Sequence, residues 1–246
     1  LNPIQCQPRR FQTYCLAGKI SGFLRMTDSG MDTSSVKLSI VIPLYNEVNT
    51  LEHVVEKVLA APFDKEIVIV DDGSSDGSGA VADRLAGRHA EIRVLHHTTN
   101  RGKGAALRSA FNEVTGDIII IQDADLEYDP ADYGTLLAPL LENKADIVYG
   151  SRFLGGPRRV LFFWHMVGNT FLTLFSNMLT NLNLTDMETG YKAFRKNVLD
   201  KLIIRSNRFG VEPELTAKFA KGNWRIYEVP ISYAGRGYDE GKKITW

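Results

Sequence analysis

Three acidic side chains, Asp123, Asp125 and Glu127, follow closely on four consecutive isoleucines at 118–121. β-Branched residues in an unbroken apolar run are typical of a strand that is buried on both faces of a parallel sheet. Carboxylates are costly in a dry core without partners, so this strand must deliver them to an open edge, where α/β proteins bind ligands. An oxygen-rich cluster of this kind suits a hard divalent cation that keeps several waters and binds phosphate.

The alternative interpretation is a loop whose acids cap the following helix, which is the role expected of Asp129 ahead of Pro130. Asp-x-Asp pairs occur often by chance, so the pattern alone leaves both interpretations open. Further polar strand ends at the same edge of the sheet would favour the metal site.

Other apolar segments also end in polar residues. These are Pro43, Tyr45, Asn46 and Glu47 after 38–42, Asp71 and Asp72 after 66–70, and Gly102, Lys103 and Gly104 after 91–95. Tyr45 offers a face for a base, Asp72 offers acceptors for a base or ribose, and Lys103 between glycines suits phosphate. These are the parts of a nucleoside diphosphate site, although the Asp-Asp-Gly-Ser and Gly-Lys-Gly segments also fit an ordinary turn and loop.

Strands alternate with helices between residues 38 and 149. We expect strands at 38–42, 66–70, 91–95, 118–121 and 146–149, helices at 48–60, 77–87, 104–114 and 131–142, and a late strand at 224–229. This alternation predicts an α/β fold with a doubly wound, mainly parallel, Rossmann-like sheet. The Gly-x-Gly-x-x-Gly and Gly-x-x-x-x-Gly-Lys-Ser/Thr fingerprints are absent, which argues against a dinucleotide or P-loop site.

Composition and the chain ends narrow the classes. The chain of 246 residues carries 29 basic and 29 acidic residues, which argues against a general nucleic-acid binder. Its two cysteines, Cys6 and Cys15, precede the expected core, which indicates a reducing, cytosolic setting. We expect residues 1–35 to be a disordered or non-native extension ahead of one domain at 36–246. We also expect the natural protein to continue past Trp246, since no helix closes the domain there.

The stretch 160–179 is mostly apolar, and polar residues recur at every third or fourth position along it and just after it, at His165, Asn169, Thr173, Ser176 and Thr180. These polar residues make a spanning helix unfavourable. Trp164 and several phenylalanines, preceded by Arg158 and Arg159, suit a helix that lies in a membrane interface. A core helix that covers the sheet fits the residues equally well.

Several motifs recur in order along residues 37–246. They are Ser39-Ile-Val-Ile-Pro-Leu-Tyr-Asn-Glu47, Ile69-Val-Asp-Asp-Gly-Ser-Ser-Asp76, Asn100-Arg-Gly-Lys-Gly104 and Gln122-Asp-Ala-Asp125. Together they resemble the family 2 inverting glycosyltransferases, whose GT-A fold adds an acceptor-side helical and β portion at the C-terminus. Gly150-Ser-Arg-Phe153 and Thr185-Asp-Met-Glu-Thr-Gly-Tyr-Lys-Ala-Phe-Arg195 are similar to the dolichol-phosphate mannose synthase and polyprenyl-phosphate glycosyltransferase branch.

The resemblance implies roles for matching residues. The nucleotide-sugar site would comprise Pro43, Tyr45, Asn46, Glu47, Asp72, Lys103, Asp123 and Arg236. Mg²⁺ or Mn²⁺ would bind Asp123, Asp125 and Glu127, although a glutamine commonly replaces Glu127 in the mannose synthases, which leaves the donor open. Arginine forks suit phosphate, and the candidates for the acceptor phosphate are Arg152, Arg158 and Arg159. Glu212 and Glu214 are both expected near the sugar.

The activity implied is transfer of mannose or glucose from a GDP- or UDP-linked donor to polyprenyl or dolichyl phosphate, with inversion. Asp123, Asp125 and Arg152 would be catalytic, at the cytoplasmic face of a membrane, with the chain peripheral or anchored by segments outside it. One alternative is a family 2 enzyme with a sugar hydroxyl as acceptor, although the Glu-Asp and Gln-x-x-Arg-Trp signatures of processive synthases are absent. The other alternative is a non-catalytic nucleotide-sugar-binding module.

Overall fold

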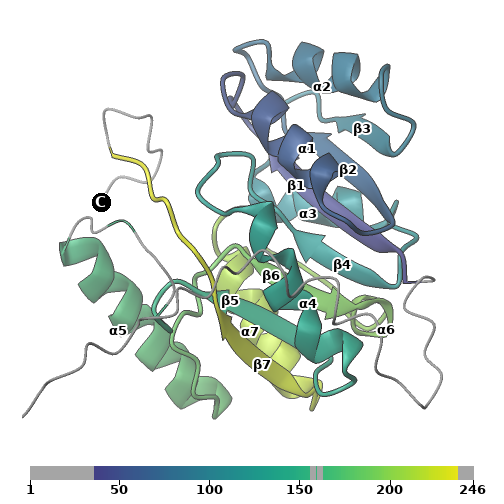
Figure 1. The fold of residues 1–246 in the computed structure, drawn as a ribbon. Helices are drawn as coiled ribbons and strands as arrows, with labels where there is room; N and C mark the ends of the chain where they lie inside the picture. Colours follow the sequence, from purple (N-terminus) through teal and green to yellow (C-terminus); the bar gives the residue numbers. More distant parts are fainter. Residues whose placement is uncertain (1–35, 156–158, 160–162, 238–246) are drawn as a thin grey trace, which may run out of the picture. The chain divides into compact units, whose positions relative to one another are not determined.

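A sheet of seven strands runs through the residues that the computed structural model describes, which are 36–155, 159 and 163–237 (Figure 1). Contacts divide the chain into Leu1–Thr33 and Ser34–Trp246, and all described residues belong to the second unit. The strands lie in the order β3-β2-β1-β4-β6-β5-β7. Their bounds are β1 (Leu38–Leu44), β2 (Lys65–Asp71), β3 (Ile92–His96), β4 (Ile118–Ile121), β5 (Ile147–Ser151), β6 (Lys192–Arg195) and β7 (Ile226–Pro230).

Helices cover both faces of this sheet, as the alternation of strands and helices predicts. On one face α1 (Leu51–Ala60), α2 (Ser78–Ala86) and α4 (Tyr133–Leu141) pack on the sheet, and the short helix η3 (Pro130–Asp132) precedes α4. On the other face lie α3 (Lys103–Phe111), α6 (Lys196–Leu199) and α7 (Val211–Lys221). The isoleucines of β4 alternate between the two cores, with Ile118 and Ile120 in the first and Ile119 and Ile121 in the second. The buried-strand prediction for 118–121 is confirmed.

The sheet is mainly parallel, with one strand that the sequence patterns miss. β1, β2, β3 and β4 run parallel to one another, and β5 runs parallel to β7. β6 lies between β4 and β5 and runs antiparallel to both, so β4 and β5 are not adjacent. Its sequence, Lys-Ala-Phe-Arg, contains neither an apolar run nor strict alternation, because the fully buried Lys192 occupies a core position.

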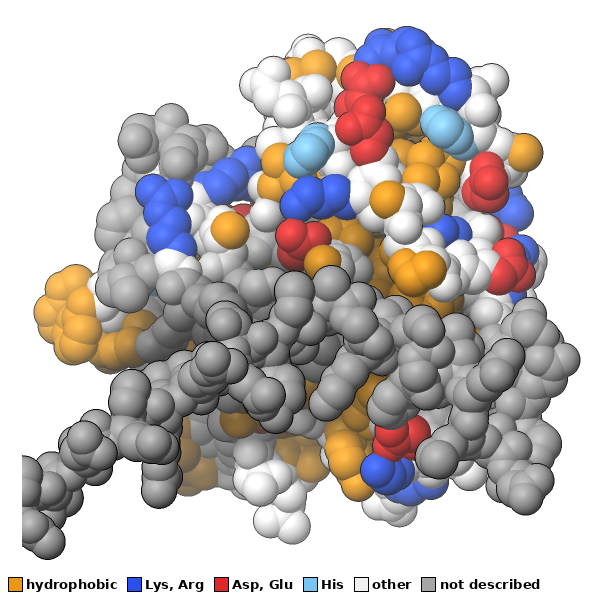
Figure 2. Space-filling model, viewed as in Figure 1, with side chains coloured by type: hydrophobic (Ala, Val, Ile, Leu, Met, Phe, Trp, Pro, Cys, Tyr) orange, Lys and Arg blue, Asp and Glu red, His pale blue; other side chains and the backbone are white. Residues whose placement is uncertain are grey.

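Helix α5 (Phe163–Thr180) carries its polar stripe on the protein side. Thr173 and Ser176 are its buried residues, and Thr173 Oγ1 accepts a hydrogen bond from the backbone N–H of Met187. The exposed large apolar residues of the helix are Phe163, Trp164, Met166, Val167, Phe171, Leu172, Leu174, Phe175, Met178 and Leu179. The core-helix alternative is therefore wrong, since the apolar face points away from the sheet. In Figure 2, exposed hydrophobic side chains gather where α5 lies in Figure 1.

Aspartate side chains accept hydrogen bonds from backbone N–H groups at the starts of η3 and α2. Asp129 caps η3 as expected, with its side chain accepting from the backbone N–H of Ala131 and Pro130 at the first helical position. Asp76 accepts from the N–H of Ser78 at the start of α2. The extension 1–35, Arg158 and residues 238–246 lie outside the described residues. Throughout the described ranges, no helix is long and apolar enough to cross a bilayer.

Candidate functional site

The acidic strand ends meet at one edge of the sheet. β1 pairs with β2 on one side and β4 on the other, and all three run in the same direction. Glu47 follows β1, Asp72 follows β2, and Asp123 and Asp125 follow β4, so the carboxyl ends of three neighbouring strands carry them. This convergence is what the sequence predicts, and it is the edge at which open α/β sheets bind ligands.

Arg236 lies among the carboxylates at this edge. Its guanidinium nitrogens are 3.0 and 3.1 Å from the two carboxylate oxygens of Glu47 and 3.3 Å from Asp125 Oδ2. The backbone N–H of Arg236 donates to Glu127 Oε1 at 2.9 Å. The segment after β7 therefore brings one cation to acids that come from the ends of β1 and β4.

Lys103 neutralises the other member of the Asp-x-Asp pair. Its ammonium lies at the start of α3, 2.8 Å from Asp123 Oδ1 and 3.1 Å from Glu212 Oε1. Burial alone would lower the pKa of Lys103, but Asp123 and Glu212 outweigh it and raise that pKa. The backbone turn before the helix requires glycine, because Gly102 has φ 96° and a side chain there would clash with the carbonyl of Asn207.

The acids fit a divalent cation that is shared with a substrate phosphate. Burial, together with the charges of Asp123 and Glu127, raises the pKa of Asp125 to about 7, and Arg236 opposes the rise. A cation would relieve that repulsion. Within the described ranges, no three His, Cys, Asp or Glu side chains are arranged as a complete metal cage. Mg²⁺ does not need one, since it usually binds through one or two carboxylates, waters and phosphate oxygens.

The residues expected to hold the nucleotide fall into two groups. Tyr45 follows β1 directly and is 40% exposed, as a side chain that stacks on a base must be, whereas Pro43 within β1 is half-buried. Asn46 and Asp72 instead fix loops. Asn46 Oδ1 accepts from the backbone N–H of Ser75, and the buried Asp72 carboxylate accepts from the N–H groups that precede Lys103. Asp72 also lies 2.6 Å from His97 Nδ1, so its oxygens are engaged within the protein.

Arg152 occupies the end of β5, next to the acidic cluster. Its Nε and Nη2 donate to the two oxygens of Asp186 at 2.6 and 2.7 Å, and Nη2 also donates to Asn169 of α5 at 3.1 Å. The guanidinium lies 5.2 Å from the ring centre of Tyr233, whose hydroxyl donates to Glu127 at 2.8 Å. Among the described residues, Nη1 of Arg152 has no hydrogen-bond partner.

Of the two other arginines expected at the acceptor phosphate, the structure describes one. Arg158 lies outside the described residues. Arg159 is described, and it binds the segment that carries Arg236: its backbone N–H donates to the carbonyl of Tyr233 and its Nη1 donates to that of Gly235. Arg159 therefore supports the segment that crosses the acids.

Glu212 and Glu214, which the sequence does not distinguish, have different surroundings. Glu212 is buried at the start of α7 and contacts Lys103 and Lys192. Glu214 binds the backbone N–H groups of Arg205 and Ser206 and the ammonium of Lys218. Only Glu212 reaches the acidic edge of the sheet.

Lys192, Tyr233 and Glu228 are site-supporting residues that sequence reasoning does not identify. Lys192 is a fully buried lysine in β6, and Glu228 of β7 accepts from the N–H groups of Thr185 and Asp186 behind Arg152. The sequence feature that could have identified Lys192 is its position in the 185–195 motif. There a lysine stands between Tyr191 and the apolar Ala-Phe pair. No local pattern marks Tyr233 or Glu228.

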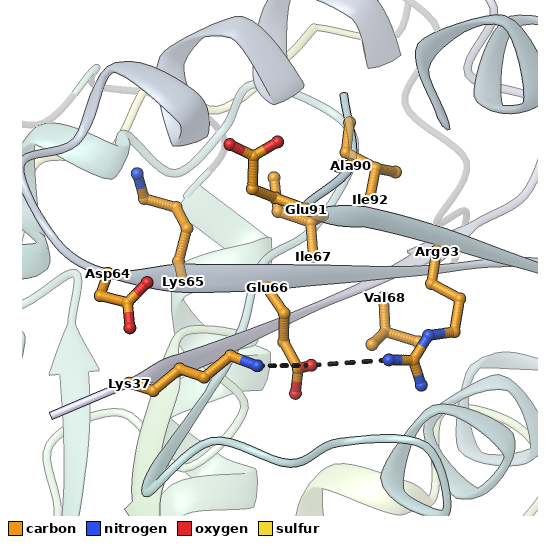
Figure 3. A pocket seen from close by; sticks show the side chains of 10 residues that line it. All are labelled: Lys37, Asp64, Lys65, Glu66, Ile67, Val68, Ala90, Glu91, Ile92 and Arg93. Carbon is orange, nitrogen blue, oxygen red and sulfur yellow. Dashed lines mark hydrogen bonds and ion pairs between the residues drawn. The ribbon is translucent and has the colours of Figure 1, made fainter. Parts of the chain in front are cut away.

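A hollow of about 580 Å³ lies at the opposite edge of the sheet, where β1, β2 and β3 begin. Figure 3 shows Lys37 and Arg93 reaching the carboxylate of Glu66 from two sides, at 3.2 and 3.7 Å. Glu66 also accepts from Ser39 and from both donors of Thr115. Hydrogen bonds saturate this carboxylate, so the hollow is a structural junction rather than part of the acidic site.

The chain belongs to the glycosyltransferase family 2, whose model matches residues 39–203. The α/β fold, with its mainly parallel sheet of seven strands, is that of the GT-A glycosyltransferases. The chain is therefore a glycosyltransferase.

Relatives and solved structures refine this assignment. The chain is 32% identical to undecaprenyl-phosphate mannosyltransferase of Micrococcus luteus, over 84% of this chain and 87% of that one. It is 30% identical to polyprenol monophosphomannose synthase of Mycolicibacterium smegmatis, over 86% and 84%. Glucosyl-3-phosphoglycerate synthase of Mycobacterium tuberculosis, crystallised with Mn²⁺, UDP and phosphoglyceric acid, superposes with a TM-score of 0.67 at 22% identity, over 85% of this chain and 74% of that one. The last comparison concerns the fold alone.

Proposed function

We propose that the chain transfers a hexose, mannose or glucose, from a GDP- or UDP-linked donor to polyprenyl or dolichyl phosphate, with inversion at the anomeric carbon. The connection from Glu127 through Tyr233 to Arg152 carries this proposal, because it sets an acidic donor side beside an arginine-centred acceptor side. The names of the two mannosyltransferase relatives support a polyprenyl phosphate acceptor and make mannose the first sugar to test.

The donor binds at the carboxyl ends of β1 and β4. The exposed ring of Tyr45 stacks on the base, and Lys103 and Arg236 supply cations for the diphosphate. Asp123 and Asp125, with Glu127 beside them, would hold Mg²⁺ or Mn²⁺. When bound, such a cation neutralises charge on the departing nucleoside diphosphate.

The acceptor phosphate binds at Arg152. Asp186 and Asn169 fix the guanidinium plane, and Nη1 is left to donate to a phosphate oxygen. That oxygen attacks the anomeric carbon, and the bond from carbon to the donor diphosphate breaks with its electron pair going to the diphosphate. A phosphate monoester is largely ionised at neutral pH, with a second pKa of about 6, so no side chain needs to act as a base.

We also propose that the apolar face of α5 contacts the surface of the membrane that holds the lipid acceptor. Asn169 on the polar side of α5 contacts Arg152 and Asp186, whereas Trp164 and Phe171 are 73% and 66% exposed. One helix would thus join the acceptor phosphate site to the bilayer interface. The expected setting is the cytoplasmic face of a membrane.

The test offers labelled GDP-mannose and UDP-glucose, each with a short polyprenyl phosphate and with Mg²⁺ or Mn²⁺. We expect label to enter the lipid fraction with one donor, and we expect Asp125→Ala to abolish the transfer. Transfer to a sugar hydroxyl but not to the lipid phosphate would support the first alternative acceptor class instead. Nucleotide-sugar binding without turnover would indicate a binding module. Full turnover in Asp125→Ala would contradict the catalytic assignment.

A further inference from the structure

Four charged side chains form a continuous series of ion pairs behind the acidic edge. Lys192 of β6 contacts Glu212 of α7, Glu212 contacts Lys103 of α3, and Lys103 contacts Asp123 after β4. The side chains of Lys192 and Glu212 are 0% and 5% exposed, and those of Lys103 and Asp123 are 15% and 21% exposed. This ion-pair series runs from the core to the acidic edge of the sheet, and the formal charges of its four members cancel.

Backbone carbonyls, as well as an opposite charge, hold the buried end of this ion-pair series. The Lys192 ammonium donates to Glu212 Oε2 and to the carbonyls of Met187 and Thr189. Its three protons are therefore all used. An ammonium without a charged partner is costly in a core, so Lys192 and Glu212 must stay together. Lys192 and Lys103 outweigh the effect of burial and lower the pKa of Glu212, which is consistent with a buried, ionised carboxylate.

The segment that carries Met187 and Thr189 also limits the space around Asp123. Gly190 follows Thr189, and its backbone N–H donates to the hydroxyl of Tyr128 at 3.0 Å. A methyl group on Gly190 would collide with Asp123 Oδ2 and would lie 3.1 Å from Lys103 Nζ. The absence of a side chain at Gly190 thus leaves the space in which Lys103 and Asp123 meet.

We propose that Lys192, Glu212 and Lys103 form a positioning relay that sets the orientation of the Asp123 carboxylate for the metal-bound donor. None of the three needs to bind the metal. Glu212 keeps the Lys103 ammonium in place when Asp123 shares its oxygens with a cation, and Lys192 keeps Glu212 in place. Partners that orient metal-binding carboxylates in this way contribute strongly to affinity. The relay rests on the proposed function, because it requires Asp123 to be a metal ligand.

The test measures the binding of Mn²⁺, alone and together with UDP or GDP, to the folded chain by calorimetry. We expect Glu212→Gln to weaken the Mn²⁺ affinity about tenfold, which is the lower end of the loss seen when such outer partners are removed. Gly190→Ala changes no charge and should weaken it by a similar factor by displacing Asp123. Glu66→Gln is the matched control, since it also removes a buried carboxylate charge paired with a lysine but lies at the opposite edge of the sheet. It should bind Mn²⁺ as the unaltered chain does.

An affinity for Mn²⁺ that is unchanged in folded Glu212→Gln would overturn the relay. If that variant does not fold, an unchanged affinity in Gly190→Ala would overturn it. If the unaltered chain binds no Mn²⁺ with either nucleotide, the proposed function fails instead. The coupling of Asp123 to Glu212 through Lys103, on which the relay depends, is tested separately by urea unfolding of Asp123→Asn, Glu212→Gln and the double variant without metal. A non-additive change of at least fivefold in the unfolding equilibrium constant supports that coupling, and additivity overturns the relay.

Discussion

Arg152 is held in one orientation by its neighbours within the protein. Asp186 takes two parallel hydrogen bonds from the guanidinium, Asn169 takes another, and the ring of Tyr233 lies against it. In the proposed acceptor site, a guanidinium that is already fixed would lower the entropic cost of binding the phosphate. The geometry that holds Arg152 therefore depends on its planar, many-donor shape as much as on its charge.

Replacing Arg152 by lysine tests that dependence. Arg152→Lys keeps the charge but cannot bind Asp186 and a phosphate oxygen together. We expect kcat/KM for the polyprenyl phosphate to fall roughly 10- to 100-fold, since a hydrogen bond to a charged group contributes about 1.5–3 kcal/mol. The donor KM should change little. Arg225→Lys is the control, because Arg225 also forms two hydrogen bonds with one aspartate, Asp146, away from the site. An Arg152→Lys variant as active as this control would contradict the role of Arg152.

Sequence motifs locate the ionisable residues of the site, but not the pairs that they form. Asp123, Asp125 and Arg152 can be predicted, because each lies in a motif that recurs in the order and spacing of a known family. The partnership of Lys103 with Glu212 joins residues more than a hundred positions apart, and no local period connects them. The same holds for Arg236, whose contacts with Glu47 depend on the path of the chain after β7.

At the level of elements, the amino ends of the first strands are joined by Glu66 in β2. Its carboxylate accepts from Ser39 in β1, from Thr115 before β4 and from Lys37. Burial alone would raise the pKa of Glu66, but these hydrogen bonds outweigh it and lower that pKa to about 2. The carboxylate is therefore stabilised in the ionised form only when β1, β2 and the turn before β4 are assembled.

Replacing Glu66 by glutamine should destabilise the fold in a pH-dependent manner. We expect Glu66→Gln to lower the free energy of unfolding at pH 7 by roughly 3 kcal/mol, because Lys37 and several buried donors lose their anionic partner. A carboxyl whose pKa is lower in the folded state stabilises above its unfolded pKa of about 4.5 and loses this contribution as the pH falls toward 2. The difference between the two chains should therefore shrink over that range in urea titrations.

The exposed Glu91 at the same edge of the sheet provides the control for that experiment. Glu91→Gln should stay within about 0.5 kcal/mol of the unaltered chain at pH 7, as surface substitutions usually do. A Glu66→Gln effect as small as that of Glu91→Gln, or one that does not depend on pH, would show that Glu66 does not join these strands.

Some strands and helices have a clear spacing of apolar residues in their sequence, and others do not. The first four strands and α1 are predictable, because apolar runs and helical spacing are encoded within each segment. β6 is not, since its register is set by the neighbours β4 and β5 and its buried lysine finds its charged partner, Glu212, only in α7, alongside two carbonyls from the segment just before the strand. Its insertion brings Gly190 next to Asp123, so an unpredicted strand shapes the predicted site.

At the scale of the whole described unit, charge and apolar surface are separated. Carboxylates and their paired cations gather at the carboxyl edge of the sheet, whereas the outward face of α5 is apolar along five turns of an 18-residue helix. Contiguous exposed apolar surface of this kind marks a site of interaction on soluble proteins. Because Asn169 of the same helix contacts Arg152, a lipid whose phosphate binds Arg152 would emerge beside that apolar face.

Two substitutions on that face test its contact with a bilayer. Trp164→Ser and Phe171→Ser should each weaken binding to phosphatidylcholine and phosphatidylglycerol vesicles about tenfold, since burying one large apolar side chain contributes about 1.5–3 kcal/mol. Ile203→Ser is the control, because Ile203 is as exposed as Trp164, at 73%, but lies outside α5. Transfer to a short, water-soluble polyprenyl phosphate should be unchanged in all three variants, whereas transfer to a long acceptor in vesicles should fall only in the two α5 variants. Equal vesicle binding by all the chains would exclude α5 as the membrane contact, and a concentration-dependent dimer lost in the α5 variants would assign its apolar face to a second copy of the chain.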